Sequence, residues 1–214
     1  MSVAAVVVAG GQGVRFGGPK QFAQMTGSTV TQRSVQGARS VASLVVLVVP
    51  EGYNGNGEGA DVVVTGGASR AASVRAGLAR CDDVEIVVVH DAVRPLATPE
   101  LFAKVVAAVI AGADAAVPGL AITDTVKRVA PEGSWSVILN TVERDDLVTV
   151  QTPQAFRRDV LVRAHESGQE ATDDSALVES IGARVVVVAG ELENLKITEP
   201  GDVERVNLIE RSIQ

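Results

Sequence analysis

The residues best suited to do chemistry stand in a glycine-rich segment near the N-terminus, where residues 9–20 read AGGQGVRFGGPK. Three glycines there leave the backbone open to a ligand: Gly10, Gly11 and Gly13. The exposed N–H groups of such a turn bind anions, and Arg15 and Lys20 add fixed positive charge. The segment predicts a phosphate-binding loop that begins at Ala9. The alternative is a plain strand-to-helix turn with two solvated cations.

Two common phosphate loops fit this segment poorly. A P-loop ATPase needs Gly-Lys followed by Ser or Thr, whereas Lys20 stands between Pro19 and Gln21. A dinucleotide-binding loop needs a third glycine where this chain has Phe16. The remaining pattern, GGxGxRFGxPKQ, resembles the N-terminal signature of nucleotidyltransferases that load sugar or polyol phosphates onto nucleotides.

A second polar group, HDAVRP at residues 90–95, follows an apolar run. Side chains that follow a parallel strand emerge at the edge of the sheet where α/β proteins bind ligands. Asp91 could accept hydrogen bonds from a ribose or lie near a divalent metal, and Arg94 could contact a substrate phosphate. The alternative is an Asp91–Arg94 ion pair that only holds the loop. We interpret His90 as a structural hydrogen-bonding residue.

Two further segments carry polar groups into the same region. The segment GGASRAAS at residues 66–73 repeats the anion-binding logic, with the backbone of Gly67 and the hydroxyl of Ser73 as candidate contacts to base or ribose. Ser69 is explained without a ligand as a helix N-cap, and residues 172–174 as a helix start. Lys196 stands in a short apolar piece, where an inward lysine needs an anionic partner.

Apolar β-rich runs recur along the chain and position these groups: Val3–Val8, Leu44–Val49, Asp61–Thr65, Val84–Val89, Ala113–Val117 and Arg184–Val188. Helix signals separate most of them, including Thr98-Pro99-Glu100 and Thr198-Glu199-Pro200. This alternation predicts an α/β fold with a Rossmann-like, mostly parallel sheet flanked by helices. We expect one domain over residues 1–214.

One stretch breaks the rhythm, at about residues 120–146. Two extended pieces, Ile122–Val129 and Trp135–Leu139, flank a turn that reads PEGS. This predicts a β-hairpin arm. Isolated hairpins are marginally stable in water, so we expect the arm to pack on a partner subunit, with packing on its own domain as the alternative.

Composition narrows the possible partners. The chain has 214 residues, a formal charge of −7 and a pI near 4.9, which argue against a nucleic-acid or anionic-membrane partner. No apolar run approaches the roughly 20 residues that span a bilayer. Cys81 is the single cysteine and cannot form an internal disulfide, and no signal-peptide pattern opens the chain, so we expect a cytoplasmic protein.

Seven motifs in order make the resemblance specific: AGGQGVRFGGPKQ, TGGASRAASV, VVVHDAVRP, DTVKR, TVER, QTPQAF and ENLKIT. Together they look like the 2-C-methyl-D-erythritol 4-phosphate cytidylyltransferase family over nearly the whole chain. The resemblance implies a GT-A-like nucleotidyltransferase fold. It also implies transfer of the cytidylyl group of CTP to the polyol phosphate, a Mg²⁺ requirement met mainly through the CTP phosphates, and a homodimer with exchanged arms.

The resemblance also implies roles for individual residues. Arg15 and Lys20 match the pair that stabilises the transition state, and Arg144 and Lys196 match the pair that positions the attacking phosphate. Thr125 and Thr152 match substrate-phosphate contacts, with Lys127 and Arg94 beside them. The remaining matches are CTP-binding elements: Ala9, Gly10, Gly11, Gly13, Gly67, Ser73, Asp91 and Ala92. No residue is predicted as a metal ligand.

Three other functions compete with this prediction. A cytidylyltransferase for another polyol phosphate, such as ribitol 5-phosphate, shares much of the same pattern. A nucleotide-binding module without activity is disfavoured because both Arg15 and Lys20 are present, and binding alone would survive the loss of one. A dinucleotide-dependent reductase is disfavoured by the missing third glycine.

Overall fold

The computed structural model of the protein describes residues 1–11 and 18–213. Its centre is a mixed sheet whose strands run in the order β10 (Val148–Val150), β7 (Ala115–Ala121), β11 (Gln154–Arg157), β6 (Ile86–Asp91), β1 (Val3–Val8), β4 (Leu44–Val49) and β5 (Val62–Thr65). β12 (Val185–Ala189) pairs with β7 in parallel. The β-branched runs without polar alternation suit strands that are buried on both faces. The predicted α/β class is confirmed, with antiparallel β10 and β11 inserted in an otherwise parallel sheet.

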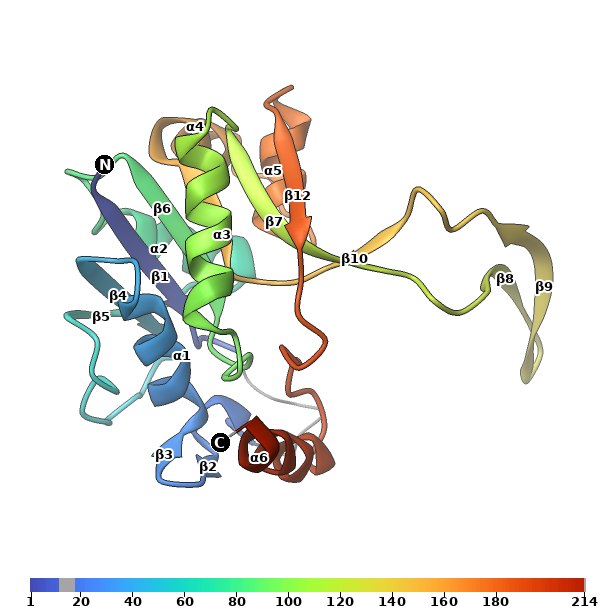
Figure 1. The fold of residues 1–214 in the computed structure, drawn as a ribbon, viewed down its shortest axis with the longest axis horizontal. Coiled ribbons are helices and arrows are strands. Elements are labelled where there is room, and N and C mark those ends of the chain that lie inside the picture. Colours follow the sequence, from blue (N-terminus) through green and yellow to red (C-terminus); the bar gives the residue numbers. More distant parts are fainter. Residues whose placement is uncertain (12–17, 214) are drawn as a thin grey trace.

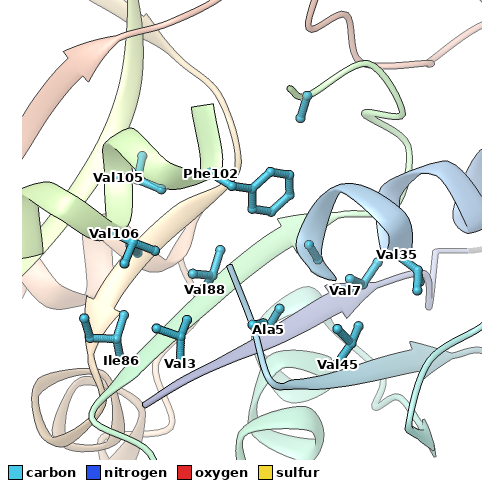
Figure 2. Packing of buried hydrophobic residues seen from close by; sticks show 14 of the residues in the cluster. Val3, Ala5, Val7, Val35, Val45, Ile86, Val88, Phe102, Val105 and Val106 are labelled. Carbon is cyan, nitrogen blue, oxygen red and sulfur yellow. The ribbon is translucent and has the colours of Figure 1, made fainter. Parts of the chain in front are cut away.

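Helices cover both faces of the sheet (Figure 1). One face packs against α1 (Val30–Arg39) and α3 (Pro99–Ile110), and the other against α2 (Arg70–Leu78), α4 (Arg158–Glu166) and α5 (Asp174–Ser180). Successive residues of a strand point to opposite faces, so Ala5 of β1 joins the first core while Val6 joins the second. Figure 2 shows the first core, where Phe102 of α3 lies over Val88.

Short polar side chains fix the helix starts that the sequence predicts. Ser69, Thr98 and Asp173 are the N-caps of α2, α3 and α5, and each side chain accepts a backbone N–H from the first turn of its helix. Such caps satisfy donors that would otherwise lack a partner. The predictions for Ser69, for Thr98 and for residues 172–174 are confirmed.

A third, smaller core joins the C-terminal helix to the segment after the glycine loop. α6 (Gly201–Ile213) contributes Val206, which packs with Met25, Val30, Val93 and Ile197. The neighbouring elements are η2 (Lys20–Phe22), β2 (Gln24–Met25) and β3 (Ser28–Thr29). Figure 1 shows α6 beside β2 and β3. This core holds the backbone near Lys20 and Lys196 on the same side of the molecule.

The predicted hairpin is present as β8 (Val126–Glu132) and β9 (Trp135–Val142), which pair antiparallel with a register shift after Arg128. Figure 1 shows it extending well away from the sheet and helices. We call residues 122–147 the arm, because β7 ends at Ala121 and the chain rejoins the sheet at Val148. Large apolar side chains of the arm are exposed, and Trp135 is 80% exposed.

β10 and β11 were not foreseen as separate strands, and their placement matters for the site. Gly119 of β7 pairs with both β10 and β12, and Ala116 pairs with both β11 and β12. β10 and β11 therefore lie along the same edge of β7, with residues 151–153 as a break between them. Among the described residues, no helix combines the length and apolar character needed to cross a membrane.

Candidate functional site

Three strand ends meet at one cavity. β1 leads into Ala9, Gly10 and Gly11, β5 leads into Gly67, and β6 ends at Asp91. The cavity has a volume of about 520 Å³, and Lys20, Ser73 and Lys196 also line it. It lies at the carboxyl edge of neighbouring parallel strands, where open α/β sheets bind ligands. Gly13 and Arg15 lie outside the described residues.

Gln21 holds the start of the glycine loop against the turn that carries Lys20. Its buried side-chain amide donates to the carbonyl oxygens of Ala9 and Gly11, each at 2.8 Å. The backbone carbonyl of Gln21 accepts a hydrogen bond from the hydroxyl of Thr31 at 2.6 Å. Two loop carbonyls thereby have a donor on the protein, so their partial negative charge is partly offset beside the N–H groups that would bind an anion.

Ser73 brings the two glycine segments together. Its hydroxyl donates to the carbonyl of Ser69 at 2.8 Å and accepts the N–H of Gly67 at 3.2 Å. A Cβ at Gly10 would stand 3.2 Å from the Ser73 oxygen, and a Cβ at Gly66 only 2.7 Å from it. The glycines are therefore needed for the close approach of the two loops, independently of any ligand.

Charged side chains form a connected network at the floor of the cavity. Lys196 Nζ donates to Asp91 Oδ2 at 2.7 Å, and Arg70 Nη2 and Nε lie 3.3 and 3.4 Å from Asp91 Oδ1. Burial alone would raise the pKa of Asp91, but the charges of Arg70 and Lys196 hold it well below its usual range. Asp91 is thus ionised, and Lys196 has the anionic partner that the sequence required.

Arg94 does not form the predicted alternative ion pair with Asp91. Its Nη1 donates to the carbonyl of Asn194 at 2.7 Å, while Arg70 and Lys196 occupy the two Asp91 oxygens. Burial lowers the pKa of Arg94, and the charge of Asp91 partly offsets this. The alternative of a loop-holding Asp91–Arg94 pair is wrong, because Arg70 and Lys196, which are distant in sequence, bind the two Asp91 oxygens instead.

A second, smaller cavity adjoins the first. Its volume is about 260 Å³, and it shares Arg70, Asp91 and Lys196 with the larger one while adding Arg94 and Thr152. Thr152 stands in the break between β10 and β11, before a cis proline. Within the described part of the chain, Nε of Arg94 and Oε1 of Gln154, which also lines this cavity, are buried without a hydrogen-bond partner. These unpaired atoms suit a polar ligand.

His90 connects the wall of the smaller cavity to the end of β6. The Thr152 hydroxyl accepts the Asp91 N–H at 3.0 Å, so its hydrogen is available to His90 Nδ1 at 3.2 Å. Nε2 then carries the ring hydrogen and donates to the Arg94 carbonyl at 3.2 Å. Burial lowers the pKa of His90 to about 4 and keeps the ring neutral. The structural interpretation of His90 is confirmed.

Among the predicted site residues that the structure describes, four do not line either cavity of their own chain. Ala92 is fully buried in the first core, and its backbone N–H donates to Val8. Thr125, Lys127 and Arg144 belong to the arm, which extends away from the sheet (Figure 1). Lys127 Nζ donates to Thr141 at 2.7 Å, and Arg144 donates to the carbonyl of Thr123.

Arg70, Gln21 and Asn194 were missed as site residues, although each lies in a motif quoted above. Arg70 has its partners 21 and 104 residues away, so no local pattern reveals them. Asn194 is fully buried and contacts Gln151, Thr152 and Arg94. Asn194 stands between Glu193 and Leu195, so its burial follows from the fold and not from a local sequence pattern.

Comparison with known proteins identifies the family. The model of the family described as IspD: 2-C-methyl-D-erythritol 4-phosphate cytidylyltransferase matches residues 3–212. The chain belongs to this family. Its members are CTP-dependent cytidylyltransferases, so the predicted family, fold and class of enzyme are confirmed.

Individual members of the family resemble the chain along most of its length. The cytidylyltransferase of Rhodococcus opacus is 43% identical, with 94% of this chain and 92% of the relative covered. The bifunctional enzyme IspD/IspF of an Anaeromyxobacter species is 44% identical over 97% of this chain, which spans 57% of that relative. The crystal structure of the Thermus thermophilus cytidylyltransferase superposes with a TM-score of 0.83 at 35% identity, covering 99% of this chain and 100% of that one.

Proposed function

We propose that this protein transfers the cytidylyl group of CTP to 2-C-methyl-D-erythritol 4-phosphate, releasing pyrophosphate, as a step of isoprenoid biosynthesis. The observation that carries the proposal is the convergence of Lys20, Lys196 and Asp91 on a cavity at the ends of β1, β5 and β6 in a member of this family. The alternative substrate, ribitol 5-phosphate, is not favoured by the names of the relatives.

We assign the larger cavity to CTP and the smaller to the polyol phosphate. The glycine segments that line the larger one suit a triphosphate and its ribose, and its volume of about 520 Å³ lies in the range of small-ligand sites. The smaller cavity is lined by Arg94, Thr152 and Gln154, and the unpaired Oε1 of Gln154 could accept a hydrogen bond from a substrate hydroxyl. Lys196 lines both, so it can hold the acceptor phosphate beside the α-phosphate of CTP.

The reaction needs charge stabilisation rather than proton abstraction. A phosphate oxygen of the acceptor attacks the α-phosphorus of CTP, and the bond from that phosphorus to the bridging oxygen of the β-phosphate breaks, so pyrophosphate leaves with the electron pair. The phosphate dianion is already a nucleophile, and catalysis depends on positioning and on cations near the developing charge. Lys20 and Arg15 are proposed for the departing phosphates, and Lys196 for the acceptor phosphate.

We propose that Mg²⁺ is bound together with CTP. Asp91 is the acidic side chain that lines the larger cavity among the residues described, and both of its oxygens already accept hydrogen bonds from cationic groups. In the described segments, no group of three or more His, Cys, Asp and Glu could hold a metal ion. These residues fit an ion that is held by the CTP phosphates with at most one protein carboxylate, and such an ion would neutralise phosphate charge.

We propose that the protein is a homodimer in which each arm completes the partner's site. The arm exposes Trp135, Ile138 and Leu139, which is unfavourable for a hairpin surrounded by water. Arg144, Thr125 and Lys127 would then reach the acceptor phosphate in the other subunit. A cytoplasmic location stays a prediction from the sequence.

A substrate panel tests the activity. The protein is incubated with CTP and Mg²⁺ plus methylerythritol phosphate, ribitol 5-phosphate or glycerol 3-phosphate, and pyrophosphate release is measured. We expect the fastest turnover with methylerythritol phosphate. Replacing CTP by ATP, GTP or UTP under the same conditions checks the nucleotide. Faster turnover with ribitol 5-phosphate would overturn the proposed acceptor, and no turnover with any acceptor would overturn the enzyme assignment.

A further inference from the structure

Behind the cavity floor, the charged network continues to residues that line neither cavity. Arg70 Nη1 donates to Asp174 Oδ2 at 2.6 Å, and His165 Nε2 donates to Asp174 Oδ1 at 3.0 Å. Asp174 is completely buried, and His165 nearly so. The chain of contacts therefore runs from His165 through Asp174, Arg70 and Asp91 to Lys196.

Arg70 is held in place by two carboxylates, those of Asp91 and Asp174. Its Nη1 contacts Asp174, while Nε and Nη2 approach Asp91. A planar guanidinium that is held by two carboxylates has little freedom to rotate. Burial alone would lower the pKa of Arg70, but the charges of Asp174 and Asp91 raise it, so the group stays cationic.

The contacts also join four separate elements. Arg70 is the first residue of α2, Asp174 the first of α5, and His165 lies in the last turn of α4, while Asp91 ends β6. Helix ends and strand ends can shift relative to one another, and a buried ion pair between them fixes their spacing. Loss of one partner leaves an uncompensated buried charge.

We propose that Asp174 is a positioning residue for the transfer site, which fixes Arg70 and thereby orients the Asp91 carboxylate and the Lys196 ammonium group. The proposal rests on the proposed role of Lys196 in binding the acceptor phosphate. Asp174 lines neither cavity, so it acts through Arg70. Misplacing a charged group by about an ångström can cost up to roughly a hundredfold in rate.

The test compares Asp174→Asn with Glu210→Gln. Glu210 is a useful control because it is also a buried carboxylate paired with an arginine, Arg33, and it lines neither of the two site cavities. We expect Asp174→Asn to lower kcat roughly tenfold to a hundredfold and to raise KM for the polyol phosphate more than KM for CTP. Glu210→Gln should lose stability while keeping wild-type kinetic constants.

A second readout does not depend on the substrate. Lys196 acylation by an amine-reactive reagent is followed by peptide mass spectrometry, with exposed Lys104 as the internal reference. We expect several-fold faster labelling of Lys196 in Asp174→Asn. Without Asp174, Arg70 no longer orients the Asp91 carboxylate, which then holds the Lys196 ammonium group less firmly. If Asp174→Asn does not fold, Arg70→Lys serves instead, since one ammonium group cannot span both carboxylates.

The outcomes separate the two proposals. Wild-type labelling and wild-type kinetic constants in a folded Asp174→Asn protein would overturn the positioning role. An equal kinetic loss in Glu210→Gln would also overturn it, because the effect would then reflect general loosening. An inactive wild type would count against the proposed function, while the labelling comparison would still decide the role of Asp174.

Discussion

Lys20 is the described cation nearest in sequence to the glycine loop, and its turn is fixed by the two hydrogen bonds from Gln21 to the loop carbonyls. If it stabilises charge on the departing phosphates, its main effect is on the transition state and not on CTP binding. Removing a comparable donor in other enzymes costs about 10²–10³ in rate, or roughly 3–4 kcal/mol.

We therefore expect Lys20→Ala to lower kcat by about 10²–10³ while calorimetry still detects CTP binding. Lys104→Ala, an exposed lysine on α3, is the matched control and should retain wild-type turnover. A Lys20→Ala protein with nearly normal kcat would contradict the proposed role. A protein that no longer binds CTP would move the contribution of Lys20 from the transition state to the ground state.

His90 gives the molecule a pH-dependent stability. Burial lowers the pKa of His90 from 6.5 to about 4. Between these two pH values His90 binds a proton in the unfolded chain but stays neutral in the folded one. The stability that neutral His90 contributes is complete above pH 6.5 and is lost as the pH falls toward 4. At pH 5 this loss amounts to about 2 kcal/mol.

We expect His90→Gln to be less stable than the wild type at pH 7 but to lose less stability between pH 7 and pH 5. Gln can still donate to the Arg94 carbonyl without binding a proton. Urea unfolding at the two pH values measures the difference. Parallel losses in the two proteins would show that another group titrates in this range.

At the residue scale, the sequence predicts the role of a side chain when its hydrogen-bond partner is close along the chain. It does not identify the partner when that residue is distant in sequence. The N-cap role of Ser69 follows from a contact three residues away. The need of Lys196 for an anion was foreseeable, but its partner Asp91 lies 105 residues distant. Arg70 was missed for the same reason, since an arginine at the start of a helix looks solvated until the fold brings two carboxylates to it.

At the scale of elements, α2 packs so close to the sheet at Gly77 that a Cβ has no room there. A Cβ on Gly77 would stand 2.9 Å from a methyl carbon of Val48 and closer still to Val6. Alanine favours a helix over glycine by about 1 kcal/mol, but overpacking a core costs about 1–3 kcal/mol. The steric cost wins because both neighbours belong to buried strands that cannot yield.

We expect Gly77→Ala to reduce the free energy of unfolding by about 1 kcal/mol, measured by urea unfolding. Gly201→Ala is the control, because it also lies in a helix and a Cβ there has nothing within 4 Å. That variant should be unchanged or slightly more stable. A stabilised Gly77→Ala would mean that α2 can move away from the sheet.

The elements themselves were largely readable from the sequence. The bounds of β1 and β4 agree with the predicted strands, because unbroken valine runs between turn signals leave little choice. β10 and β11 escaped prediction because each has at most four residues, and their pairing with β7 depends on tertiary contacts. Short strands carry too few residues for a periodic pattern.

At the scale of the whole molecule, the arm extends away from the sheet (Figure 1), and its Arg144 lines neither cavity of its own chain. If it acts in the partner's site, Lys20→Ala and Arg144→Ala damage different halves of a shared centre. A heterodimer of the two variants then contains one site with both changes and one with neither. Random mixing should restore about a quarter of wild-type activity, because half the dimers are mixed and each has one intact site.

The experiment mixes the two inactive variants under conditions that allow subunit exchange and follows pyrophosphate release. Native mass spectrometry verifies that mixed dimers form. Each variant incubated alone is the control. No recovery despite verified exchange would argue that Arg144 acts within its own chain or not at all. Protein that stays monomeric throughout would contradict the proposed dimer.

The arm leaves the sheet from β7 and rejoins it at β10, and this arrangement bears on how the arm can vary in evolution. Ala121 and Val148 are paired residues of adjacent antiparallel strands, so the arm begins and ends at neighbouring positions. It is in effect a very long hairpin loop, and the entropy of closing such a loop depends only weakly on its length. The arm can therefore be shortened, extended or exchanged between relatives while the hydrogen bonds at its base stay the same. Substitutions at the tip of the arm can therefore change which subunit it binds without altering the strand ends where the nucleotide would bind.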